Sequence, residues 1–449
     1  MLENLPLLDT DSLTGANTNH APALSRRRLK VLVNAFACSP TKGSEQGVGW
    51  GWVRAIAKYH DLWVLTSDEY RREIEDELGR WPDTRSCPTF YYLYWRRHTF
   101  AERIWPPEHL ANYRHWQQTA YSLGRRLHDD IHFDIVHQLT YVGYRVPGKL
   151  WQLGVPFVWG PIGGLEQVTW SLLPRLGLYG ALYFGIKNLL NDFDRRFSLL
   201  PKRAFAAAEG GIIAATTGIQ HEIERFYGQS SVVISEIGLP QITRRASAMR
   251  SLNEPLRLLW CGNLLPGKAL PFLLAALAGL QSELDWRLEI IGSGPSEDSW
   301  RKCARKHGVN DRLKWAGTVP RTAVLEAMQQ AHALIVTSVY DLTSTVVVEA
   351  LASGLPVICP DRFGFKDAVT PDCGIRFDAS TPMKFIARLR ESIVRIADEE
   401  LRLRLSRGAI AQSSRYEWDT KAEALDRIYR AKHKSENLRQ SEAYVEKHA

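Results

Sequence analysis

The chain has 449 residues, 45% of them hydrophobic and 24% charged, which is the balance of a globular protein with two or three domains. Its formal net charge of +8 suits an anionic partner, such as a phosphorylated substrate or an anionic membrane surface. Because the basic residues are spread through the chain and form no recognisable nucleic-acid-binding motif, we expect no nucleic acid partner.

The cysteines and the apolar runs indicate a cytoplasmic protein. Six cysteines are scattered without a C-x-x-C pair or a histidine at metal-ligand spacing, as is typical of a reducing compartment. No apolar run approaches the ~18 residues of a membrane span. Three arginines precede the apolar run that starts at Leu29, but this run suits a buried strand, so we expect residues 1–28 to be a disordered lead-in rather than a signal peptide.

Strand-like apolar segments alternate with amphipathic segments along most of the chain. This alternation favours parallel sheets with crossover helices, so we predict an α/β fold of two Rossmann-like domains. The predicted strands read, in chain order, LKVLVNAFA, LWVLTS, TFYYLYW, FDIVHQL, VPFVWG, GGIIAAT and SVVISEIG, and then LRLLWCG, WRLEIIGSG, RLKWAGTV, HALIVTS, LPVICP and GIRF.

The polar, Pro-bounded segment LPQITRRASAMRSLNEPL separates the two sets of strands and is typical of an interdomain linker. We therefore predict one domain at 29–240, a linker at 241–254 and a second domain at 255–415. The polar end of the chain, 436–449, is predicted to be a flexible tail. Ligands bind at the carboxyl ends of parallel strands, so we expect a site in the cleft between the two sheets.

The predicted first domain holds two features with open interpretations. His137 closes the strand FDIVHQL, where a histidine is either a structural group or a catalytic one. The segment WSLLPRLGLYGALYFGIKNLLNDFDRRFSLLPKRAF mixes aromatic residues, leucines and basic residues. It is either a helical insertion that packs on the core or an interfacial surface that meets a membrane.

The most informative stretch of the second domain is DLTSTVVVEALASG, residues 341–354. A helix is predicted to begin at Thr343, Ser344 and Thr345, where unpaired backbone N–H groups and the helix dipole favour an anion, although hydroxyl residues also cap helices routinely. Asp341 and Glu349 flank this turn. One carboxylate can bind sugar hydroxyls before the turn, and the other can bind hydroxyls on the far side of a phosphate.

This acid-x7-acid arrangement, followed by EALASGLPVI, resembles the E-x7-E signature of the GT4 family of retaining GT-B glycosyltransferases. The resemblance covers nearly the whole chain after residue 28 and implies a GT-B fold, with two Rossmann-like domains facing across a cleft. It assigns the donor sugar to Asp341 and the nucleotide ribose to Glu349. This chain has Asp where Glu is commoner, and LTS replaces the usual GFG.

Other stretches of the second domain resemble the same family. LLWCGNLLPGK is similar to the strand and G-R-L-x-x-x-K that hold the donor diphosphate: Gly262 and Lys268 match, and Asn263 replaces the arginine. Neutralisation of the diphosphate would then rest on Lys268 and the helix N-terminus. LEIIGSGP, with Gly292, resembles the next strand and loop, and WAGTVPR the loop that commonly touches the base.

The first domain and the C-terminal segment extend the resemblance. Gly47 and Gly49 stand where the family carries a Gly-Gly loop that lets the backbone approach donor and acceptor. The family often orients a histidine toward the reacting sugar, which implies this role for His137. YEWDTKAEALDRIY resembles the helix that crosses back to the first domain, predicted at 416–435, with Trp418 and Tyr429 as packing anchors.

A D-x-D at Asp192 and Asp194 matches the metal-diphosphate signature of the other main glycosyltransferase fold. Because the pair lies in an apolar and basic segment rather than after a strand, we predict no metal site. We also expect no cofactor, since the nucleotide sugar is a substrate.

The resemblance implies a retaining, metal-independent hexosyltransferase that moves a sugar from a nucleotide-diphosphate donor to a glycan or lipid-linked saccharide. The expected setting is cell-surface or exopolysaccharide biosynthesis in the cytoplasm, with peripheral contact with an anionic membrane at its inner face. Two alternatives stay open: a GT-B nucleotide-sugar epimerase or hydrolase, and a catalytically silent binding subunit of a polysaccharide assembly.

Overall fold

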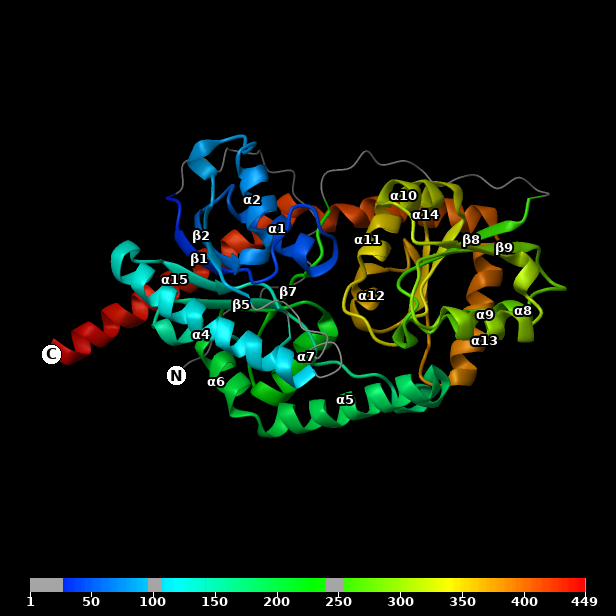
Figure 1. Ribbon diagram of the computed structural model, residues 1–449, viewed down its shortest axis with the longest axis horizontal. Coiled ribbons are helices and arrows are strands. Elements are labelled where there is room, and N and C mark those ends of the chain that lie inside the picture. Colours follow the sequence, from blue (N-terminus) through cyan, green and yellow to red (C-terminus); the bar gives the residue numbers. More distant parts are fainter. Residues whose placement is uncertain (1–26, 96–105, 142, 240–253, 449) are drawn as a thin grey trace.

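The computed structural model describes residues 27–95, 106–141, 143–239 and 254–448. Two α/β domains lie side by side in it, each built on a parallel sheet (Figure 1). The predicted α/β class with two Rossmann-like domains is confirmed. The predictions for a disordered lead-in and for an interdomain linker fall almost wholly outside the described residues.

The first domain contains, within the described residues, a seven-stranded sheet in the order β3-β2-β1-β4-β5-β6-β7, and every neighbouring pair is parallel. Its central strands are buried on both faces, as expected where helices cover both sides of a parallel sheet. The strands are β1 (Lys30–Asn34), β2 (Asp61–Ser67), β3 (Thr89–Leu93), β4 (Ile135–Gln138), β5 (Phe157–Ile162), β6 (Ile212–Ala214) and β7 (Val232–Val233). The helices are α1 (Ser44–Ile56), α2 (Arg71–Leu78), α4 (Pro106–Ile131), α5 (Gly177–Phe197), α6 (Leu199–Ala207) and α7 (Thr217–Tyr227).

The second domain repeats this architecture with a six-stranded parallel sheet in the order β10-β9-β8-β11-β12-β13. From β8 the chain adds strands to one side of the sheet, and from β11 it adds them to the other side. The loops that follow β8 and β11 are therefore the expected ligand site. The strands are β8 (Leu256–Cys261), β9 (Trp286–Ile291), β10 (Leu313–Gly317), β11 (Ala333–Ile335), β12 (Val357–Pro360) and β13 (Gly374–Phe377). The helices are α8 (Leu270–Ala278), α9 (Glu297–Lys306), α10 (Arg321–Gln330), α11 (Thr345–Ala352), α12 (Phe363–Ala368), α13 (Pro382–Ile396) and α14 (Glu399–Ser413).

Helix α15 (Trp418–His448) leaves the second domain and packs against α1 of the first. Two glycines make room for its first residue: a Cβ on Gly51 would lie 2.2 Å, and one on Gly238 2.4 Å, from ring atoms of Trp418. The segment predicted as a flexible tail, 436–449, continues α15 as a helix through His448 and contains no Gly or Pro up to that residue (Figure 1).

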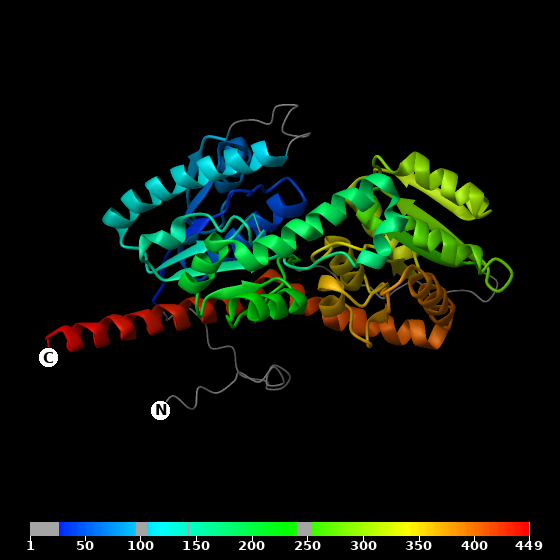
Figure 2. The ribbon, with the colours of Figure 1, turned by 90° about the horizontal axis from the view of Figure 1, so that it is seen from below.

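Helix α5 is placed unlike the other helices of its domain. Figures 1 and 2 show it running along one side of the molecule, from the first domain to the second. It follows a 3-10 helix, η6 (Trp170–Leu176), and precedes α6. None of the helices in the described ranges has the length and apolar content needed to cross a membrane.

Candidate functional site

Three loops of the second domain meet at the carboxyl ends of neighbouring strands. Gly262 follows β8, Gly292 follows β9, and Asp341 lies beyond the end of β11. A Cβ on Gly292, which has a φ of +131°, would lie 2.0 Å from the carbonyl oxygen of Gly262. The two loops therefore touch backbone to backbone, and Gly292 is needed for this close approach.

Lys268 ends the short 3-10 helix η7 (Pro266–Lys268), which follows β8. Its Nζ donates to the carboxylate of Asp341 in a short, part-buried ion pair. The hydroxyl of Thr337 donates to the carbonyl oxygen of Lys268 at 2.6 Å, which holds the turn in place. Two residues that the sequence assigned separately, to the diphosphate and to the sugar, are thus in contact. Asn263 is exposed in the same loop.

Glu349 lies on the buried side of α11, with a side chain only 7% exposed. Its Oε1 accepts a hydrogen bond from Nε of Arg321, the first residue of α10, at 2.8 Å. Arg321 is the last residue of the loop WAGTVPR and was not predicted as a site residue. The sequence offered one indication of its role: Arg321 is a cation at the end of the loop expected to touch the base.

The turn before α11 is bonded differently from a simple cap. Ser344 is the N-cap residue, and no side chain caps the helix there, so its amides keep their capacity to bind an anion. Thr343 is different, because its amide already donates to Oε1 of Glu236 at 3.0 Å. The amide of Thr343 is therefore already bound within the protein, unlike the free donor expected at this turn.

Glu236 belongs to a buried pair of charged groups close to the chain that joins the two domains. Lys421 of α15 is also buried, and its Nζ donates to the carbonyl oxygen of Ser235. Burial raises the pKa of Glu236 and lowers the pKa of Lys421, since each loses hydration in its charged form. The pair links the first domain, α15 and the turn before α11, and the sequence alone contained no signal for it.

A cleft of about 680 Å³ separates the two domains beside this turn. From the second domain Arg321, Thr345 and Glu349 line it, and from the first domain the segment 40–44, Gly47, Arg54 of α1 and Lys58 just beyond that helix do. Trp418 also lines the cleft, in addition to the packing role predicted for it. Lys268 and Asp341 are not among its lining residues.

The two glycines predicted to form a loop lie inside α1. Gly47 lines the cleft, and a Cβ there would lie 2.5 Å from the carbonyl oxygen of Lys42. Gly49 is buried instead, where a Cβ would lie 2.1 Å from the carbonyl oxygen of Ala37. Gly47 thus stays a candidate for backbone approach to a ligand, whereas Gly49 lets α1 pack closely on the loop that follows β1.

His137 does not face the cleft. It lies on β4 in the interior of the sheet and is fully buried, with Nδ1 2.6 Å from the hydroxyl of Tyr429 and Nε2 2.7 Å from the carbonyl oxygen of Gly160. Burial lowers its pKa to about 4, so the ring is neutral near pH 7. Both ring nitrogens are satisfied inside the protein, which contradicts the expected orientation toward a sugar and leaves His137 as a structural group.

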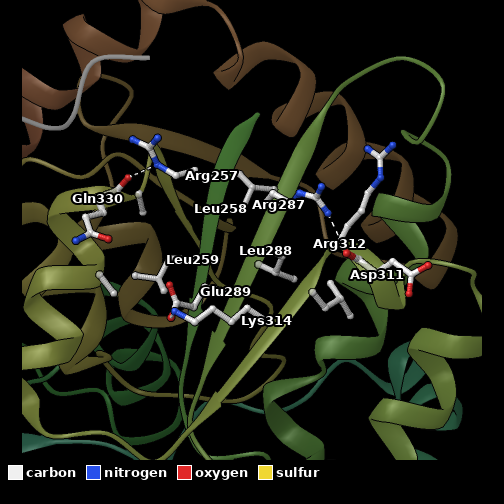
Figure 3. Close-up of a pocket in the computed structure, with 13 residues that line it drawn as sticks. Arg257, Leu258, Leu259, Arg287, Leu288, Glu289, Asp311, Arg312, Lys314 and Gln330 are labelled. Atoms are coloured by element: carbon white, nitrogen blue, oxygen red, sulfur yellow. Dashed lines mark hydrogen bonds and ion pairs between the residues drawn. The ribbon is translucent and has the colours of Figure 1, made fainter. Parts of the chain in front are cut away.

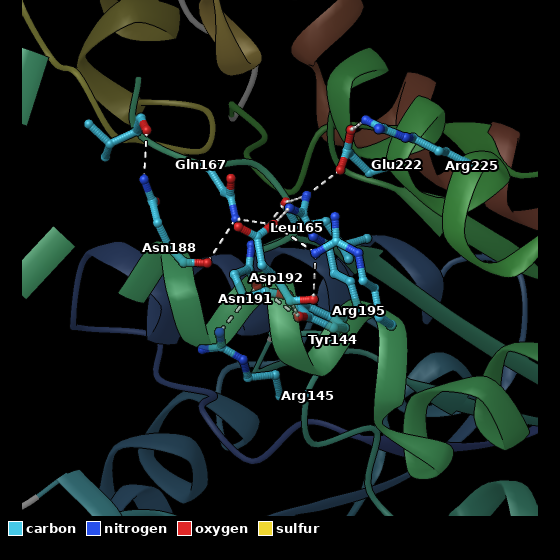
Figure 4. Close-up of polar contacts among 12 residues, drawn as sticks. Tyr144, Arg145, Leu165, Gln167, Asn188, Asn191, Asp192, Arg195, Glu222 and Arg225 are labelled. Carbon is cyan, nitrogen blue, oxygen red and sulfur yellow. Dashed lines mark hydrogen bonds and ion pairs between the residues drawn. The ribbon is translucent and has the colours of Figure 1, made fainter. Parts of the chain in front are cut away.

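Both D-x-D residues of α5 have partners within the protein, and Figure 4 shows Asp192 among cations and amides. Asp192 pairs with Arg195 at 2.5 Å and accepts from Gln167 at 3.0 Å, while Asp194 pairs with Arg145 at 2.5 Å. In the part of the chain that the structure describes, no three His, Cys, Asp or Glu side chains come together in a metal-binding group.

A second cavity, of about 320 Å³, lies at the opposite, amino-terminal ends of β8, β9 and β10 (Figure 3). Its charged side chains bind within the protein: Lys314 pairs with Glu289 at 2.8 Å, and Arg287 donates to the carbonyl oxygen of Asp311 at 2.9 Å. Because these groups already have partners and the cavity lies away from the carboxyl ends of the strands, we assign it no ligand.

This fold and this arrangement of strand-end loops define the class of GT-B proteins. Sucrose-phosphate synthase from Thermosynechococcus elongatus superposes with a TM-score of 0.60 at 15% identity, over 90% of this chain and 99% of that one. The Anabaena protein HepE, solved with UDP and glucose, gives 0.54 at 14% identity, over 90% of this chain and 100% of that one. The predicted GT-B fold is confirmed.

Within that class, residues 246–412 match the family described as glycosyl transferases group 1. A glycogen synthase from Mycobacterium tuberculosis is 26% identical over 242 residues, which are 53% of this chain and 58% of that protein. A D-inositol 3-phosphate glycosyltransferase from Acidothermus cellulolyticus is 31% identical over 202 residues, 41% of this chain and 44% of that protein. The chain thus matches about half the length of these relatives.

Proposed function

We propose that the protein is a retaining glycosyltransferase that transfers a sugar from a nucleoside-diphosphate sugar to a glycan or lipid-linked saccharide. One observation carries the proposal: each acid of the acid-x7-acid stretch is paired with a cation, on either side of a helix N-terminus that no side chain caps. Such a turn offers amides and positive charge to a diphosphate, with a carboxylate on each side for hydroxyl groups.

The diphosphate would lie at the N-terminus of α11 and within reach of Lys268. A bound diphosphate competes with Asp341 for the Lys268 ammonium, and this exchange frees the carboxylate to accept hydrogen bonds from the sugar hydroxyls. Glu349, held by Arg321, would accept hydrogen bonds from the ribose. The support for a nucleotide donor is this geometry together with the presence of UDP in the HepE structure.

In the proposed reaction, the bond between the anomeric carbon and the diphosphate oxygen breaks, and the acceptor oxygen bonds to the same face of that carbon. The acceptor proton passes to the departing diphosphate. Lys268 and the α11 amides stabilise the negative charge that develops there, so the proposed mechanism requires no metal ion and no cofactor.

The acceptor would enter from the first domain, where the segment 40–44 and Gly47 line the cleft. We place the protein in the cytoplasm, at the inner face of the membrane, in the synthesis of a cell-surface or storage polysaccharide. Because two relatives are named glycogen synthase and D-inositol 3-phosphate glycosyltransferase, soluble acceptors are tested beside lipid-linked ones.

A donor screen tests the proposal. UDP-glucose, ADP-glucose and GDP-mannose are each added to the protein, and the unfolding temperature is measured; a ligand at ~100 times its Kd raises the free energy of unfolding by roughly 2.7 kcal/mol. The stabilising donor is then incubated with lipid extract and with soluble glycans. Transfer to either acceptor supports the proposal. Donor hydrolysis or epimerisation alone favours the epimerase or hydrolase, and stabilisation without turnover favours a silent binding subunit.

A further inference from the structure

Helix α5 has its polar face inside and its apolar face outside. Its exposed positions are occupied almost entirely by large apolar side chains, nine in number, most of them more than half exposed. Arg196 is the one charged residue among the exposed positions of the helix. The nine are Leu178, Tyr179, Leu182, Tyr183, Ile186, Leu189, Leu190, Phe193 and Phe197. At 1.5 Å per residue this outer face is about 28 Å long.

The inner face of α5 explains why the helix is held with this orientation (Figure 4). Asn188 donates to the carbonyl oxygen of Val168 at 2.8 Å, and Asn191 donates to that of Leu165 at 3.0 Å. Arg195 is buried and binds Glu222 as well as Asp192. These polar side chains are satisfied only if they point inward, so the apolar residues between them must face outward.

Exposed basic residues lie on α5 and on the elements that precede and follow it in the chain. Arg175, Arg196, Lys202 and Arg203 are exposed on η6, α5 and α6, whereas the acids of the segment, Asp192 and Asp194, are held in ion pairs. A second copy of the chain docked on the same face would bring two positive rims together. An anionic bilayer instead offers hydrocarbon to the apolar stripe and phosphate to its rim.

We propose that the outer face of α5 is a docking surface for an anionic phospholipid bilayer, on which the helix lies in the plane of the interface. Tyr179 and Tyr183, at one end of the stripe, suit the headgroup layer with their amphipathic rings. This inference deepens the proposed function, because it names the surface from which a lipid-linked acceptor would be supplied.

The inner face of α5 also contacts the turn that carries Lys268. Phe184 packs beneath Gly267, where a Cβ would lie 2.8 Å from its ring, and its ring centroid is 5.6 Å from that of Tyr340. Nζ of Lys187 lies 3.8 Å from the centroid of the Tyr340 ring, next in the chain to Asp341. Docking through α5 would therefore place the bilayer on the same side as the proposed transfer site.

Vesicle flotation tests the proposal without any donor or acceptor. We compare phosphatidylcholine vesicles with vesicles of equal parts phosphatidylcholine and phosphatidylglycerol, at low and high salt. Wild-type protein should float with the anionic vesicles and less so as salt rises. A variant with Leu182, Ile186, Leu189 and Phe193 changed to Gln should lose about a hundredfold or more in partition coefficient. Replacing Arg175, Arg196, Lys202 and Arg203 with Ser should remove the preference for phosphatidylglycerol.

A matched control changes Met383, Val394 and Leu438, exposed apolar residues on α13 and α15, to Gln and should float like wild type. Ile186→Asp, a single exposed change, repeats the test with little risk to folding. The proposal would be overturned if the folded α5 variants floated like wild type. It would also be overturned if wild-type protein formed a dimer in the absence of vesicles and the same substitutions abolished that dimer. Donor-induced stabilisation in vesicle-free buffer tests the proposed function independently, so the two failures are distinguishable.

Discussion

The Glu349→Gln substitution tests the proposed donor site most directly. Glu349 is nearly isosteric with Gln, and its Oε1 already accepts from Arg321 at 2.8 Å, which a Gln oxygen can continue to do. The substitution then replaces the second carboxylate oxygen, the acceptor left for the ribose, with an NH₂ group. A hydrogen bond to a charged group is worth about 1.5–3 kcal/mol, so the Kd of the stabilising nucleoside diphosphate should rise by about 10- to 150-fold.

Isothermal titration calorimetry measures this Kd, and thermal unfolding checks the fold. The Arg321 side chain is 58% exposed, so weakening its ion pair should cost less than about 1 kcal/mol of stability. Glu289→Gln is the matched control: its partner, Nζ of Lys314, lies 2.8 Å away, at the opposite ends of the strands. Wild-type affinity in Glu349→Gln would refute the assignment, and so would an equal loss in Glu289→Gln.

Three further predictions concern catalysis, packing and pH. Lys268→Ala should lower kcat by about 10²–10³-fold with little effect on the free energy of unfolding. The wild-type protein should keep its turnover in EDTA; a loss of turnover that Mg²⁺ restores would contradict the metal-free mechanism. Tyr429→Phe leaves Nδ1 of buried His137 without its partner and should cost about 1–3 kcal/mol in urea unfolding while kcat is unchanged; a large fall in kcat would return His137 to catalysis. Burial raises the pKa of Glu166 to about 7, so the native state keeps a proton that the unfolded state loses, and stability should fall as pH rises from about 4.5 to 7. Glu166→Gln should remove this loss, so that the variant has a free energy of unfolding about 2–3 kcal/mol higher than wild type at pH 8 and equal to it near pH 4. A difference in the free energy of unfolding that does not change with pH would contradict the raised pKa of Glu166.

The sequence by itself determined the features that depend on local patterns. Buried parallel strands are short continuous apolar runs, so the positions of the strands along the chain and the division into two α/β domains could be predicted from the sequence. The turn before α11 and the position of Lys268 after a strand are likewise local, because each depends on a few consecutive residues. The acid-x7-acid spacing, with Asp341 before the helix and Glu349 on it, could be recognised for the same reason.

Only the tertiary structure decided which of these side chains meet and which are buried. Arg321 reaches Glu349 across 28 positions of sequence, and Glu236 reaches Thr343 across 107, so no local pattern indicated either contact. The burial of His137 depends on Tyr429, 292 positions away. For α5 the sequence indicated a helix with apolar and polar residues, but periodicity does not say which face points outward. The carbonyl groups of Leu165 and Val168 bind Asn191 and Asn188, and satisfying these buried polar groups turns the apolar face to the outside.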